Sequence, residues 1–116
     1  MSVWPTEIRL ATDRRSLTVA FEDGEVYTMS AELLRVNSPS AEVQGHSPEQ
    51  RVTVPGKRSV TIEAVKPVGS YAVRLVFDDG HDSGLFTWTI LHDIGKDQAA
   101  RFAAYLAELE AKGLSR

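Results

Sequence analysis

The chain has 116 residues, with 13 Lys and Arg against 16 Asp and Glu, which gives a formal net charge of −3. It has no cysteine, and this excludes disulfides, cysteine-held metal sites and a cysteine nucleophile. The slightly acidic balance gives no general attraction for nucleic acid, and no apolar run is long enough to cross a membrane. No secretory signal is visible. We therefore expect a single cytoplasmic domain over residues 1–116, with neither nucleic acid nor membrane as a partner.

The N-terminal part of the sequence predicts three strands and a short helix. Alternating apolar and polar residues, the pattern of half-buried strands, cover 6–11, 16–21 and 26–29. Asp23-Gly24 lies between the last two runs and predicts a type I′ hairpin turn. Ser30 predicts the N-cap of a short helix, which Asn37 ends.

Residues 37–59 form the polar middle of the chain. Three of the five prolines lie in this stretch, so we expect a loop with little regular structure. Two more strands are predicted over 60–65 and 71–77, and the second of them leads into another Asp-Gly turn at 79–80.

Residues 19–34 and residues 75–91 form an imperfect internal repeat. Both stretches contain a strand, an acidic Asp-Gly turn, a return strand and a helix that begins at a hydroxyl residue. The second copy replaces the apolar return strand with His81, Asp82, Ser83 and Gly84. This break in the pattern predicts a bulge or a site.

The C-terminal part predicts two helices. Thr87 is a predicted N-cap, and Gly95 is expected to end the first helix. The second helix, over 96–112, has a predicted apolar face made of Ala99, Phe102, Ala103, Leu106 and Leu109. Together the elements predict an α+β domain, with five to seven short strands in a mainly antiparallel sheet and two or three helices packed on one face.

Histidines are the first candidates for chemistry, because imidazole binds metals and carries protons near neutral pH. His81 follows a tight turn, and His46 lies in the polar loop. With Glu42 or Asp82 they would form a two-His, one-carboxylate metal set. The alternative is that His81 is a polar turn residue and His46 is solvated.

Two other groups of residues carry weaker hypotheses. Ser38 and Ser40 suggest a nucleophile with a histidine base, but turn chemistry and helix termination explain them better, since no G-x-S-x-G elbow surrounds them. Trp4, Tyr71 and Trp88 would line a pocket or belong to the core.

Three stretches give the chain a family resemblance: LRVNSPSAEVQGH at 34–46, EAVKPVGSYAV at 63–73 and FDDGHDSGLFTW at 77–88. The chain resembles the small N-terminal domain of gamma-butyrobetaine hydroxylase, and in particular its stand-alone bacterial members. The similarity covers about residues 5–112. Relatives of this domain also occur fused to Mrp-type P-loop ATPases implicated in iron–sulfur cluster assembly.

The resemblance implies a zinc site held by a C-P-C-x-x-C motif and the histidine of a D-G-H motif. These ligands fall on Ser38, Ser40, Val43 and His81, so the histidine alone is retained. We expect no zinc and no other cofactor, and we expect His81 to hydrogen-bond Ser38, Ser40 or Glu42 instead. The oxygenase domain of the hydroxylases is expected to be absent, so their activity is not expected here.

These observations favour a non-catalytic accessory or protein-interaction domain, connected through its relatives with iron–sulfur or metal metabolism. Its contact surface is expected on an exposed sheet face or edge and on the 37–59 loop. The alternative is a small-ligand or metal-binding protein that uses His81 and His46. The expected state is a monomer or a weak homodimer.

Overall fold

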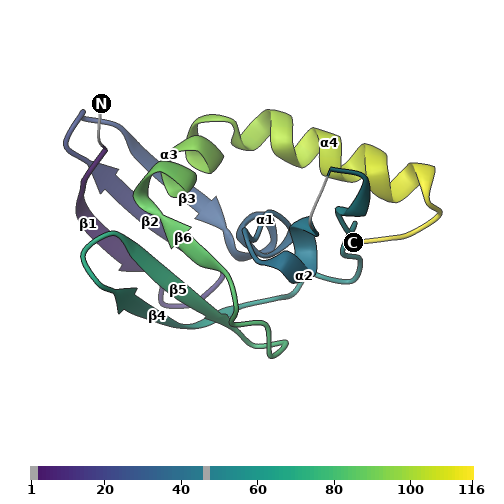
Figure 1. Cartoon of the computed structure of the whole chain (residues 1–116), viewed down its shortest axis with the longest axis horizontal. Coiled ribbons are helices and arrows are strands. Elements are labelled where there is room, and N and C mark those ends of the chain that lie inside the picture. The colour runs from purple at the N-terminus through teal and green to yellow at the C-terminus, as the bar shows by residue number, and fades with distance from the viewer. Residues whose placement is uncertain (1–2, 46–47) are drawn as a thin grey trace.

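The protein has an α+β fold with two three-stranded antiparallel sheets and four helices in the described residues, which are 3–45 and 48–116 of the computed structural model (Figure 1). The first sheet contains β1 (Pro5–Leu10), β2 (Ser16–Phe21) and β3 (Val26–Ser30). The second contains β4 (Ile62–Val68), β5 (Ala72–Phe77) and β6 (Leu85–Thr87). The helices are α1 (Ala31–Val36), α2 (Ala41–Gln44), α3 (Trp88–Lys96) and α4 (Gln98–Ala111), with a 3₁₀ turn at Pro48–Gln50.

The predicted fold class is confirmed, and the strands divide between two sheets. Each central strand turns alternate residues inward, as a half-buried strand does. The inward residues are Leu17, Val19 and Phe21 on β2 and Val73, Leu75 and Phe77 on β5. All six belong to one hydrophobic cluster, so the two sheets share a single core.

The two Asp-Gly turns have the same backbone geometry. The N–H of Phe21 donates to the Glu25 carbonyl (2.9 Å), and the N–H of Phe77 donates to the His81 carbonyl (3.0 Å). Gly24 and Gly80 have φ angles of 89° and 90°, whereas the residues before them do not have positive φ. The predicted type I′ turn is therefore wrong. These are three-residue hairpin loops in which glycine alone takes the left-handed position.

The N-caps of α1 and α3 are confirmed, but Gly95 does not end α3. The Leu33 N–H donates to Ser30 Oγ (3.0 Å), and the Ile90 N–H donates to Thr87 Oγ1 (3.2 Å). Gly95 lies inside α3 and is buried, and a Cβ there would collide with the ring of Tyr27. Glycine at this position allows close helix–sheet packing.

The buried face of α4 overlaps the predicted one only in part, at Phe102 and Leu109. Figure 1 shows most of α4 extending beyond the sheets, beside α1, which it contacts. Tyr105 and Leu109 are its buried residues, and they form a small cluster with Val36. Phe102 is partly buried, while Ala99, Ala103 and Leu106 are exposed. The face is rotated because α4 packs against α1 and the 51–54 segment, with the Tyr105 hydroxyl donating to the Val54 carbonyl.

The 37–59 stretch is a loop that contains two short helical elements. It contains α2 and the 3₁₀ turn, and Ser38, Ser40 and Val43 are buried. Its second half is tied to α4 by the Arg51–Glu108 ion pair, whose shortest distance is 2.6 Å. Residues 51–59 contain no helix or strand, so the prediction of little regular structure is correct there. It is wrong for the first half of the stretch, which contains α2 and the 3₁₀ turn.

Candidate functional site

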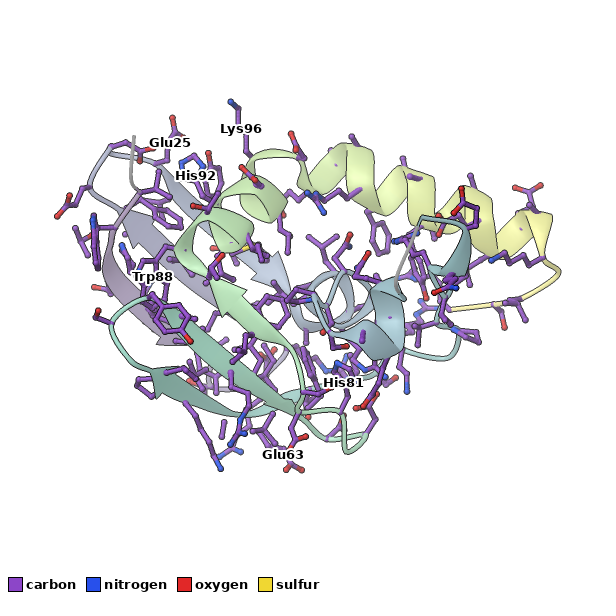
Figure 2. All side chains as sticks on the ribbon, in the orientation of Figure 1. Glu25, Glu63, His81, Trp88, His92 and Lys96 are labelled. Carbon is purple, nitrogen blue, oxygen red and sulfur yellow. The ribbon has the colours of Figure 1, made fainter. Side chains whose placement is uncertain are left out.

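The predicted site residues meet where the segment after α1 packs on the turn between β5 and β6. Ser38, Ser40 and Glu42 come from the end of α1 and the start of α2, and His81 follows the second Asp-Gly turn. Figure 2 places His81 beneath α2 in that corner. Ser38, Ser40 and His81 are almost inaccessible, with exposed fractions of 0%, 6% and 5% for the whole residues. We call these three residues together with Glu42 the histidine corner.

Every nitrogen of the His81 ring has a partner. Nδ1 lies 2.9 Å from Glu42 Oε2, and Nε2 lies 2.9 Å from Ser38 Oγ and 3.3 Å from Ser40 Oγ. A carboxylate can only accept, so Nδ1 donates to Glu42. In the neutral ring Nε2 then accepts a hydroxyl hydrogen. All three hydrogen-bond partners expected for His81 are therefore present together.

Ser83 and Gly84, which belong to the predicted break at 81–84, also support the corner, although neither was proposed as a site residue. Ser83 Oγ donates to Glu42 Oε1 (3.2 Å), so the Glu42 carboxylate holds both His81 and the following loop. Gly84 is buried, and a Cβ at this position would collide with Ser38 Oγ. The signal for both was the polar interruption at 81–84, where glycine permits a close approach.

Asp79 forms a second network directly beside the corner. One carboxylate oxygen accepts from the His81 backbone N–H (3.0 Å), and the other lies 2.7 Å from Arg35 Nε and 2.7 Å from Lys57 Nζ. Burial raises the pKa of Asp79, but the hydrogen bonds from Lys57, His81 and Arg35 outweigh burial and lower the pKa to about 2. Asp79 therefore stays ionised and fixes the backbone that carries His81.

Of the remaining predicted residues, Asp82 does not join the corner. Asp82 is exposed, and no hydrogen bond or ion pair of the described residues involves it. His46 lies outside the described residues. Within 3–45 and 48–116, no group of three or more His, Asp or Glu is arranged to hold a metal ion.

The corner does not fit the zinc site that the resemblance implies. Two neutral hydroxyls and one imidazole are a poor donor set for Zn²⁺, and Val43 has no donor atom. The chain has no cysteine, so any cysteine-based zinc site is absent.

Ser38, His81 and Glu42 are connected in the order of a catalytic triad, but Ser38 is inaccessible to solvent. Ser38 Oγ, His81 and Glu42 form a continuous hydrogen-bonded chain. A hydrolytic nucleophile must reach a carbonyl of the substrate, and Ser38 has no exposed surface. The arrangement supports a structural role for the serines.

A second feature lies at the other end of the sheets. Trp4, Tyr71 and Trp88 line one predominantly apolar groove of about 230 Å³, together with Val3, Thr87 and Thr89. Trp4 and Tyr71 are 42% and 52% exposed, and the Trp88 indole N–H donates to the Ser70 carbonyl (2.9 Å). Figure 2 shows Trp88 well separated from His81. We call this feature the aromatic groove.

Comparison with known proteins identifies the family. The family model described as gamma-butyrobetaine hydroxylase-like, N-terminal, matches residues 8–92. The chain belongs to this family. No match was found among curated proteins. No helix of the described residues is long and apolar enough to cross a membrane.

Three solved structures of the family's fold are similar to the chain. Two are NMR solution structures: one is 45% identical over 100% of this chain and 91% of its own, with a TM-score of 0.86. The other is 47% identical over 99% and 86%, with a TM-score of 0.84. The third is a crystal structure of a protein of unknown function of the DUF971 family from Acidithiobacillus ferrooxidans. It is 38% identical over 78% of this chain and 91% of its own, with a TM-score of 0.65.

Proposed function

We propose that this member of the gamma-butyrobetaine hydroxylase-like N-terminal family is a non-catalytic protein-interaction domain that binds a partner through the aromatic groove. The observation that carries the proposal is the position of Trp4, Tyr71 and Trp88. All three line one groove; Trp4 and Tyr71 are exposed, and Trp88 is partly buried. Tryptophan and tyrosine dominate binding energy at protein interfaces, and a groove of this size accepts an apolar side chain of a partner.

The histidine corner supports the non-catalytic part of the proposal. Its hydroxyls are buried and its imidazole is fully hydrogen-bonded, which suits a structural element better than a reaction centre. The 37–59 loop, expected as part of the contact surface, is held against α4 over its second half. The aromatic groove, where β1, the β4–β5 turn and the start of α3 meet, is therefore the better candidate surface.

The link with iron–sulfur or metal metabolism stays a prediction that depends on the family resemblance alone. The alternative, a metal or small-ligand site that uses His81 and His46, gains no support from the described residues, because both His81 ring nitrogens already have partners. The oligomeric state, monomer or weak homodimer, also stays a prediction.

A partner screen with matched variants tests the proposal. The tagged wild-type chain and the Trp4→Ala/Tyr71→Ala variant are recovered from cells of the source organism, and co-purifying proteins are quantified by mass spectrometry. The control variant is Val26→Ala/Val52→Ala, which removes two exposed apolar side chains outside the aromatic groove. We expect one protein to be enriched with the wild type and the control but depleted with the aromatic variant.

Binding between the purified chain and the purified partner then tests whether the interaction is direct. Titration calorimetry with that protein should show saturable binding, weakened by about tenfold or more in the aromatic variant. Equal binding by the aromatic variant and the wild type, or no saturable binding by purified proteins, would overturn the proposal.

A further inference from the structure

The segment after α4 folds back and places an arginine against a buried carboxylate. Gly113 has a φ of 67°, and the Leu114 N–H donates to the Leu109 carbonyl (2.8 Å), which reverses the chain at the helix end. Figure 1 shows this segment returning from the end of α4 toward α1 and α2. Arg116 Nε donates to Glu32 Oε2 (3.1 Å), and Nη2 donates to Glu32 Oε1 (2.8 Å).

Glu32 is a buried acid that requires a cation. Its exposed fraction is 6%, and among the described residues Arg116 is the cation with which it forms an ion pair. A carboxylate removed from water without a partner is strongly destabilising. The Arg116 guanidinium also lies over the Phe102 ring, 5.1 Å from its centroid. A carboxylate that accepts two parallel hydrogen bonds beside an aromatic face selects a guanidinium over an ammonium group.

Space for a longer ligand exists on both sides of Arg116. A groove of about 530 Å³ extends along the outer side of the first sheet and the start of α4. It is lined by Ser16, Thr28, Ser30, Leu33, Gln98 and Ala99, besides Glu32, Phe102 and Arg116. A second groove of about 600 Å³ is lined by Leu106, Leu114 and neighbouring residues, and Arg116 lines it too. The exposed apolar side of α4 therefore runs between two grooves that share one arginine.

We propose that Glu32 and Phe102 form a binding site for an arginine side chain carried by an extended segment of a partner protein, and that Arg116 occupies this site in cis. The charge of Glu32 determines the occupant, because any segment that displaces Arg116 must bring its own cation. The flat, delocalised guanidinium is the cation that matches both the carboxylate and the ring. Hydroxyls in the first groove would bind the backbone of the segment, and Leu106 and Leu114 would contact its apolar side chains. This site is independent of the aromatic groove.

Vacating the site in cis tests whether it accepts an arginine in trans. The Arg116→Ala variant should have a lower Tm than the wild type, and N-ethylguanidinium should restore the Tm in a saturable manner. Ethylammonium at the same ionic strength should not. The Glu32→Gln/Arg116→Ala double variant removes the charge and should lose the rescue. Rescue that does not saturate, or that is equal in the double variant, would overturn the site.

A second experiment, with short peptides, tests whether the site binds an arginine that is part of a peptide segment. A blocked Ala-Arg-Leu peptide should bind Arg116→Ala about tenfold or more tightly than it binds the wild type, whereas the peptide with citrulline, the neutral analogue of arginine, should not bind. Equal affinity for the arginine and citrulline peptides, or rescue by N-ethylguanidinium without peptide binding, would overturn the proposed occupant. If Arg116→Ala does not fold, the Arg116→Lys variant takes its place, because lysine keeps the positive charge but lacks the planar guanidinium that forms two parallel hydrogen bonds. Perturbation of the Glu32 and Phe102 amide signals by the arginine peptide is then the NMR readout, and its absence contradicts the proposal.

Discussion

Arg35 and His92 occupy equivalent positions in two helices, and each binds the aspartate of the opposite hairpin turn. Each is the fifth residue after the N-cap of its helix, α1 or α3. Arg35 Nε lies 2.7 Å from Asp79 Oδ2, and His92 Nε2 lies 2.8 Å from Asp23 Oδ2. The helix of each copy of the internal repeat is thus joined to the turn of the other copy.

The equivalence extends to the strands. Pro5 pairs with Phe21 next to a bulge in β1, and Ile62 pairs with Phe77 next to a bulge in β4. The protein is therefore built from two copies of a three-stranded meander followed by a helix. The copies differ most at residues 81–84, where the second one departs from the return strand and directs His81 into the histidine corner.

Replacing Asp79 with Asn should lower the free energy of unfolding at neutral pH by about 1–2 kcal/mol, after allowance for partial exposure of the side chain. The pKa of Asp79 is lowered in the folded protein to about 2 from an ordinary value of 3.8. Its stabilising contribution is therefore complete above pH 3.8 and is lost as the pH falls toward 2. Urea unfolding at pH 7 and thermal unfolding down to pH 2 measure the two effects.

The control for this prediction is Asp82→Asn. Asp82 lies three residues further along the chain, is exposed and has no ion pair among the described residues. This variant should keep the stability and acid sensitivity of the wild type. Acid unfolding of Asp79→Asn as steep as that of the wild type would contradict the role assigned to Asp79.

Replacing His81 with Ala should destabilise the protein by about 1–2 kcal/mol, because two buried hydroxyls lose their common partner. Urea unfolding monitored by tryptophan fluorescence measures the change. Glu42→Gln is the matched comparison: its amide oxygen still accepts from His81 Nδ1, and the side chain is 68% exposed. Glu42→Gln should therefore lower the free energy of unfolding much less than His81→Ala does. An unchanged unfolding midpoint for His81→Ala would count against a structural role.

Replacing Gly84 with Ala should destabilise the fold by about 1–3 kcal/mol through overpacking, since the added Cβ meets Ser38 Oγ. Combining it with Ser38→Ala removes the atom that the new methyl group meets. The double variant should then be more stable than the sum of the two single effects predicts. Strict additivity in a double-mutant cycle, measured by urea unfolding, would show that the two positions are not in contact.

Local signals in the sequence account for most of the secondary structure. The alternation in β2 and β5, the glycines of the hairpin turns and the hydroxyl caps of α1 and α3 each act within a few residues. The division of the strands into two sheets has no such signal, because it depends on which strands pair. The buried face of α4 was predicted only in part for the same reason: Tyr105 is buried by its contact with the distant Val54 carbonyl.

The site was predictable only in part. His81 was found because it breaks an apolar pattern. Ser38 and Ser40 were first considered as nucleophiles, and the family resemblance then indicated them as partners of His81. No local sequence signal identifies Arg35 or Lys57 as a partner of Asp79, because both lie far from Asp79 in the sequence. From the sequence alone, either residue would be interpreted as a solvated surface charge. His92, in α3, likewise binds a residue distant in sequence, Asp23, through the packing of α3 on the first sheet.

Replacing Ser38, Ser40 and Val43 together with Cys should create a zinc site with about one ion per chain. The family resemblance places the ligands at these positions, and His81 Nε2 already faces the first two. Thiolates provide the charge and softness that hydroxyls lack. Elemental analysis, and the thiolate charge-transfer bands of a Co²⁺-loaded sample, measure binding.

Two controls accompany the triple-cysteine variant. The same variant with His81→Ala should bind zinc more weakly and lose tetrahedral geometry, while the wild type without a histidine tag should contain no stoichiometric zinc. Zinc in the wild type, or none in the triple-cysteine variant, would contradict the view that hydrogen bonds have replaced the metal in this corner.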